Sequence, residues 1–181
     1  WYALAGTLIL AAGVVVHLVY ATVLTLHNRS SRGSQRYAMT AEPEGVTWAS
    51  RNMYVLGIII VLGLLLHLYN FWYNMQFAEI IGNHELGPFP PADGAAYIAA
   101  LFSSPVYCII YLVWFAAIWF HLTHGFWSAF HTIGWDNQTW LPRLKRIANV
   151  VATIVFLCFA LVVIVFYLRS LGVCGGSCAG F

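Results

Sequence analysis

Three histidines lie inside apolar runs that are each long enough to cross a bilayer. They are His17 in LILAAGVVVHLVYATVLTL, His67 in MYVLGIIIVLGLLLHLYNFW and His121 in VYCIIYLVWFAAIWFHLTHGFW. An ionisable side chain at membrane depth is costly, usually faces the interior of a helix bundle, and marks a functional site by default. For an imidazole in this setting, a metal is the obvious partner.

Three buried imidazoles on separate helices favour haem over other partners. A single buried histidine can form a hydrogen bond with a hydroxyl or carbonyl of the next helix. Such bonds explain three buried histidines on three helices less well. Helix bundles commonly hold haem iron between imidazoles, whereas no buried Cys, Asp or Glu completes a tetrahedral zinc site. Gly13, Gly57, Gly63 and Gly125 would let a flat macrocycle approach a helix, although ordinary helix packing explains them equally well.

The remaining histidines are weaker candidates, with one exception. His27 and His131 lie near predicted helix ends and His84 lies in a loop, where an imidazole carries little desolvation cost. The exception is His124, which follows His121 by three residues on one helix face. The depth of each histidine in the membrane, counted along its helix, does not decide whether His121 or His124 pairs with His17. The predicted helix ends are uncertain by several residues, which is as large as the difference in depth.

The positions of these histidines depend on four predicted helices. Of the 181 residues, 61% are hydrophobic and 8% are charged, which indicates an integral membrane protein. A hydrocarbon core of about 30 Å needs about 20 apolar residues of helix, and stretches near 2–26, 53–76, 104–130 and 147–170 meet this need. A barrel would need shorter, alternating segments. We therefore expect an all-α, polytopic transmembrane bundle that forms one domain over residues 1–181.

Basic residues predict the orientation of this bundle. They gather between the first two and the last two helices, whereas residues 77–102 carry only acidic charges; the basic residues are Arg29, Arg32, Arg36, Arg51, Arg143, Lys145 and Arg146. By the positive-inside rule, loops 27–52 and 131–146 are cytoplasmic, and loop 77–103 and the C-terminus lie outside. The first helix then starts outside without a signal peptide, so we expect one further helix before it. A basic loop can also bind anionic lipid, and no feature predicts a nucleic-acid partner.

The four cysteines carry less information. Cys108 and Cys158 lie in apolar helix and are expected to be small buried hydrophobic residues. Cys174 and Cys178 lie on the predicted outer side, where an oxidising compartment permits a disulfide. An unpaired tail is an equally good interpretation.

Three ordered segments carry a family resemblance: HLVYATVLTLHNRSSRG, WASRNM with HLYNFWYNMQF, and FHLTHGFWSAFHTIGWDNQTWLPRLKRI. They resemble the dihaem cytochrome b subunit of succinate dehydrogenase and fumarate reductase, and most closely the b558 type of Bacteroidetes-like bacteria. The resemblance spans nearly the whole chain. The family has five transmembrane helices, in agreement with the further helix expected from the charges.

The resemblance implies two b haems, each held by two histidines, with three of the four ligands in this chain. His17 and His121, in the FH motif, would hold the haem nearer the cytoplasm. His67, in HLYN, would ligate the outer haem, whose second ligand lies on the family's first helix. His124 is then the alternative ligand or packs beside the haem, and Arg51 is the best candidate to meet a propionate. An acidic residue that precedes the FH ligand in some relatives is missing here.

The resemblance also implies a function. Menaquinol or menaquinone would react in a bacterial inner membrane, and electrons would cross the haems to an iron–sulfur subunit on the cytoplasmic face. A flavoprotein beyond it would interconvert fumarate and succinate. This chain would be an enzyme subunit without a dicarboxylate site, in a heterotrimer able to dimerise.

Two other functions compete with this interpretation. A proton-coupled transporter would also use buried histidines, but the apolar runs show no interior proline and no evident repeat. A cytochrome b anchor of another respiratory dehydrogenase would share the haems but not the WASRNM and HGFWSAF motifs.

Overall fold

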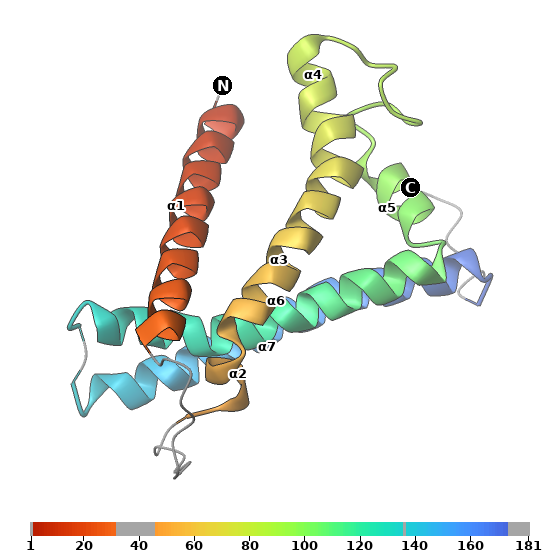
Figure 1. The fold of residues 1–181 in the computed structure, drawn as a ribbon. Helices are drawn as coiled ribbons and strands as arrows, with labels where there is room; N and C mark the ends of the chain where they lie inside the picture. Colours follow the sequence, from red (N-terminus) through yellow and green to blue (C-terminus); the bar gives the residue numbers. More distant parts are fainter. Residues whose placement is uncertain (1, 32–45, 136, 174–181) are drawn as a thin grey trace. The chain divides into compact units, whose positions relative to one another are not determined.

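The computed structural model describes residues 2–31, 46–135 and 137–173, within which helices are the only regular secondary structure (Figure 1). The predicted all-α class is confirmed. In chain order the helices are α1 (Tyr2–Ser31), α2 (Trp48–Arg51), α3 (Met53–His67), η1 (Leu68–Phe77), α4 (Ala78–Ile81), α5 (Gly94–Leu101), α6 (Pro105–Thr132) and α7 (Trp140–Ser170). The chain divides into two units, Trp1–Gly57 and Ile58–Phe181, with the boundary inside α3. The single domain over 1–181 stays a prediction.

Four helical segments are long and apolar enough to cross a membrane, as the sequence predicted. They are Tyr2–Ser31, Met53–Ile81, Pro105–Thr132 and Trp140–Ser170. Most of them extend beyond the predicted limits, because backbone hydrogen bonds continue through polar residues where the apolar run has stopped. Pro105 and Pro142 lie in first turns, where a missing N–H breaks no helical hydrogen bond.

In the first unit, α1 is apolar over most of its length, becomes polar from His27 to Ser31, and buries none of its residues. The hydroxyls of Thr7 and Thr22 each donate to a backbone carbonyl four residues earlier, at 2.8 Å. They therefore expose no unpaired donor to hydrocarbon. Such a helix is suited to contact with lipid or with further helices. Predicted features at Arg32, Arg36, Cys174 and Cys178 lie outside the described residues.

In the second unit, α6 and α7 form a hairpin with small residues at their contact. Four alanines are buried there, namely Ala117, Ala148, Ala152 and Ala160. Small side chains let helix backbones approach closely in membranes, and interhelical hydrogen bonds add to the packing. One such bond joins Trp119 Nε1 to Thr153 Oγ1 at 2.9 Å. The hairpin is the frame against which α3, η1 and α5 are placed.

Directly after His67, α3 continues into a ten-residue π-helix, η1, which no sequence pattern predicted. A π-helix has hydrogen bonds between residues five apart, is rare, and often occurs at functional sites. The Asn74 side-chain amide donates to the carbonyls of Tyr69 and Asn70, at 3.0 and 3.1 Å. Because each turn is wider, residues four and five positions after His67 share its face of the helix.

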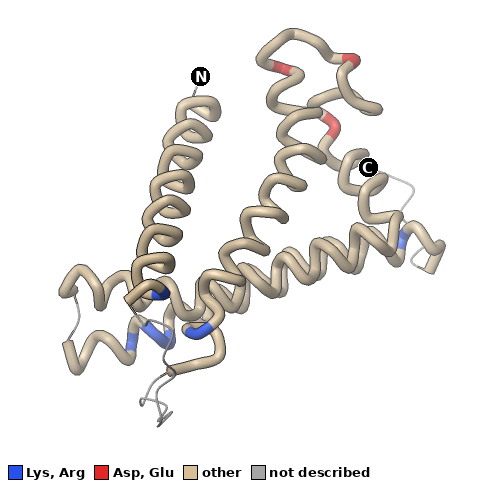
Figure 2. Tube along the Cα trace, viewed as in Figure 1, with Lys and Arg blue, Asp and Glu red and all other residues tan. Residues whose placement is uncertain are grey.

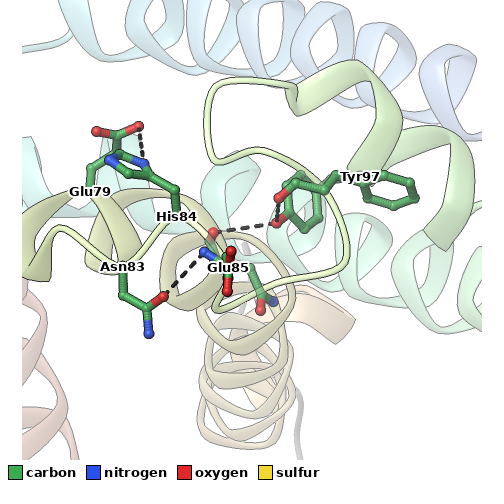
Figure 3. A network of polar contacts seen from close by, with 7 residues as sticks. Glu79, Asn83, His84, Glu85 and Tyr97 are labelled. Carbon is green, nitrogen blue, oxygen red and sulfur yellow. Dashed lines mark hydrogen bonds and ion pairs between the residues drawn. The ribbon is translucent and has the colours of Figure 1, made fainter.

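The segment between α4 and α5 is fastened by a small polar network (Figure 3). Gly82 ends α4 in the left-handed conformation, with φ of 66°. His84 Nδ1 lies 3.7 Å from Glu79 Oε1, although both side chains are largely exposed. The buried Tyr97 of α5 donates its hydroxyl proton to the Phe89 carbonyl at 2.7 Å, and this hydroxyl lies 3.4 Å from the Asn74 carbonyl. Tyr97 thus ties the loop to η1.

Replacing Tyr97 with phenylalanine is expected to loosen this loop. The ring would still pack, but the Phe89 carbonyl would lose its donor, at a cost of about 1 kcal/mol. Faster limited proteolysis within residues 82–93 would report the change. Tyr69→Phe is the control, because it removes an exposed hydroxyl from η1. Equal cleavage rates for the two variants would contradict the role given to Tyr97.

In the second unit, acidic and basic residues gather at different helix ends, with one basic exception (Figure 2). The acidic residues Glu79, Glu85 and Asp93 lie in and after α4, whereas Arg143, Lys145 and Arg146 lie in the first turns of α7 and Arg169 lies in its last turn. Two of these basic groups cover tryptophan rings, with Lys145 Nζ 4.0 Å from the Trp127 ring centroid. The four apolar spans are compatible with a multi-pass membrane protein. The orientation of the protein in the membrane stays a prediction.

Candidate functional site

His67 is the last residue of α3 and is surrounded by aromatic rings. Its ring centroid lies 5.1 Å from that of Phe71, 5.5 Å from that of Trp114 and 6.4 Å from that of Tyr111. Its Nδ1 is buried and has no hydrogen-bond partner among the described residues. A buried polar atom without a partner is costly, so this nitrogen marks a position where a further group is needed.

His67 borders a large apolar cavity, called the main cavity, with a volume of about 550 Å³. Helices η1, α5, α6 and α7, with Phe102 directly after α5, supply the rest of its lining, and no charged side chain is among the described lining residues. Its aromatic lining residues are Phe71, Phe102, Tyr111, Trp114, Phe115, Trp119, Phe156 and Phe159. Cofactor pockets typically measure about 300 to 1,000 Å³ and are mostly apolar with few polar groups. The main cavity fits this description.

Close packing between α3 and α6 builds one wall of the main cavity. Gly63 lies so near the Trp114 indole that a Cβ there would clash with the ring. Trp114 Nε1 donates to the Ile60 carbonyl at 3.0 Å, and the Asn70 amide donates to the Tyr111 hydroxyl at 3.2 Å. Gly63 was expected to leave room for a macrocycle, but it makes room for Trp114 instead. At Gly13, no atom of another element in the described part of the chain lies within 4 Å of such a Cβ.

These features suit a haem with respect to shape and ligand. A flat, apolar macrocycle matches an aromatic cavity, and an imidazole whose buried nitrogen finds no partner within residues 2–31, 46–135 and 137–173 matches an axial ligand. His67 is the sole histidine among the described lining residues. A second axial ligand would come from another segment, as the resemblance implies.

A second pocket, called the outer pocket, adjoins the main cavity and shares His67, Phe71 and Met75 with it. Its volume is about 370 Å³, and its other lining residues are Leu68, Trp72, Gln76, Glu79, Pro91 and Ala92. The indole Nε1 of Trp72 is buried without a hydrogen-bond partner in the described part of the chain. Sequence reasoning missed Trp72, because tryptophan near a helix end is typical of the membrane interface.

The other predicted site residues are spread over both units. His121 lies partly buried on α6, and the neighbouring Ile118, Trp119 and Leu122 line the main cavity. His17 lies on α1 in the first unit, so its pairing with His121 stays a prediction. His124 packs against Trp127, with ring centroids 5.0 Å apart.

Arg51 ends the short helix α2, which begins with a capping box between Thr47 and Ser50. The arginine is exposed, and its contact with a propionate stays a prediction.

Comparison with protein-family models, with curated proteins and with solved structures found no match for this chain. Among the described residues, no three His, Cys, Asp or Glu side chains gather in a way that could hold a metal ion. A structural zinc site needs four such ligands, whereas haem iron needs at most two from the protein.

Proposed function

We propose that this chain is a dihaem cytochrome b membrane anchor of a succinate:quinone oxidoreductase. The observation that carries the proposal is His67, whose buried Nδ1 has no partner in the described part of the chain, at the edge of an aromatic cavity between helices. The choice of family comes from the resemblance of its sequence motifs. Four apolar spans and a fold built only of helices in its described part are compatible with it.

The residues of this chain would bind and orient the outer haem in the main cavity. His67 would supply one axial nitrogen, and Trp114 and Phe71 would pack against its imidazole ring. The apolar lining would exclude water from the iron, which favours electron transfer over reaction with oxygen. When bound, haem iron accepts and releases one electron at a time. His17 and His121 would hold the inner haem.

The proposed partners follow from the same family. Menaquinol or menaquinone would exchange electrons with the haems within the membrane. An iron–sulfur subunit and a flavoprotein would complete the complex on the side of the basic residues that begin α7. This chain would anchor them and would not bind the dicarboxylate.

A haem assay tests the proposal directly. The complex should be isolated from membranes and analysed by a reduced-minus-oxidised spectrum and a pyridine haemochrome assay. We expect two b haems per copy of this chain, with spectra typical of two histidine ligands. A complex free of haem b would contradict the proposal, and a chain that is isolated without haem b and without partner subunits would favour a proton-coupled transporter. Haem b together with partners of another dehydrogenase would identify a different anchor.

A further inference from the structure

We propose that the indole N–H of Trp72 donates a hydrogen bond to a propionate carboxylate of the haem held by His67. Trp72 is then a positioning residue that also tunes the electron affinity of this haem. The inference rests on the proposed function, because it needs a haem in the main cavity.

The first observation is the state of the Trp72 nitrogen. An indole N–H is a donor only, and leaving it buried without an acceptor is costly. Trp114 and Trp119 meet this need, since they donate to the Ile60 carbonyl and to the Thr153 hydroxyl. Trp72 Nε1 is buried and has no such acceptor among the described residues, while its ring stacks on Phe77 with centroids 5.8 Å apart. We therefore expect this N–H to donate to an acceptor other than the described residues.

The second observation is the position of Trp72 relative to His67. Trp72 lies in η1, five residues after His67, which is the hydrogen-bond spacing of a π-helix, and both side chains line the outer pocket. A haem is apolar except for its two carboxylates, and a carboxylate in a membrane lies toward the nearer polar interface. From His67, that direction follows η1 and α4 toward the charged segment around Glu79 and His84. Trp72 lies on this path.

The third observation concerns the charge of the outer pocket. Glu79 also lines it, and a carboxylate would repel a propionate. The Glu79 side chain is 49% exposed and lies 3.7 Å from His84 Nδ1, so its charge is solvated. Gln76 adds an amide that can donate a second hydrogen bond.

A quinone carbonyl is the other acceptor oxygen that could meet Trp72. The propionate is favoured because the outer pocket shares His67 with the main cavity.

The test compares the wild-type complex with Trp72→Phe, which keeps an aromatic ring and removes the N–H. A hydrogen bond lowers the effective negative charge of a propionate, so its loss stabilises the oxidised haem. We expect the reduction equilibrium constant of the outer haem to fall about three- to tenfold, with a shift of the propionate bending band in the resonance Raman spectrum. Trp140→Phe, at an exposed site on α7, should change neither.

Each outcome decides the inference. An unchanged potential and Raman band in a haem-replete Trp72→Phe complex would overturn it and leave the proposed function intact. A shift that vanishes when quinone is extracted would also overturn it, because the acceptor would be a quinone carbonyl. If Trp72→Phe loses the outer haem, the variant Trp72→His is tested next, because its ring still donates an N–H. Recovery of the haem in Trp72→His supports the inference, and no recovery overturns it. Wild-type complex without haem b would overturn the proposed function itself.

Discussion

Replacing His67 with leucine is expected to leave the isolated complex with one b haem instead of two. Leucine fills a similar space and adds no polar atom to the apolar main cavity, so the change removes an iron ligand with little disturbance of packing. The pyridine haemochrome content should fall by about half. A redox titration of the remaining absorbance should then fit one component.

Matched substitutions identify which haem is lost. His17→Leu and His121→Leu should each remove the other haem, and the two variants should share one residual spectrum. His84→Leu should keep both haems, because His84 is exposed and pairs with Glu79. If His67→Leu retained both haems, the ligand assignment would be wrong. If His17→Leu and His121→Leu lost different haems, the inner pair would be wrong.

Replacing Gly63 with alanine is expected to have the largest effect on stability. The added methyl group would clash with the Trp114 indole, which is only 8% exposed and has little room to move. Overpacking of this kind costs about 1 to 3 kcal/mol. Displacement of the ring would also break its hydrogen bond to the Ile60 carbonyl and its contact with His67. Thermal unfolding in detergent should therefore begin at a lower temperature.

Two further variants serve as controls for the loss of stability in Gly63→Ala. Gly13→Ala meets no atom of another element within 4 Å and should be neutral or slightly stabilising, because alanine favours helix more than glycine does. The double variant Gly63→Ala/Trp114→Leu should recover part of the stability lost by Gly63→Ala, since the smaller side chain relieves the clash. Equal stability of Gly63→Ala and Gly13→Ala would contradict the close packing of α3 on α6.

The sequence allowed the four spans to be predicted, because their length and apolar composition suffice for that purpose. It also singled out His67, whose placement in an apolar run anticipated an unusual environment. The ends of α1 and α7 were less predictable, since a helix continues through polar residues that hydropathy excludes. The short helix α5 was not predicted, because Gly94–Leu101 lies in a segment that reads as an outer loop.

Other features depend on tertiary contacts that no local pattern encodes. The π-helical hydrogen bonds of η1 differ from α-helical ones by a single position, and residue type does not select between them. The role of Gly63 depends on Trp114, which lies more than fifty residues away in the chain and on another helix. Within the described residues, the N–H of Trp72 is left unpaired only because of the way η1 lies beside its neighbours.

Each turn of η1 holds about one residue more than an α-helical turn. Deletion of one residue within Leu68–Phe77 could therefore be absorbed by a return toward α-helical geometry, with the helix still continuous. Such a deletion would leave Glu79 and the loop beyond it on the same side of the helix axis while His67 stayed in place. The length of this segment can therefore change by one residue without turning the following loop away from its present side of the helix.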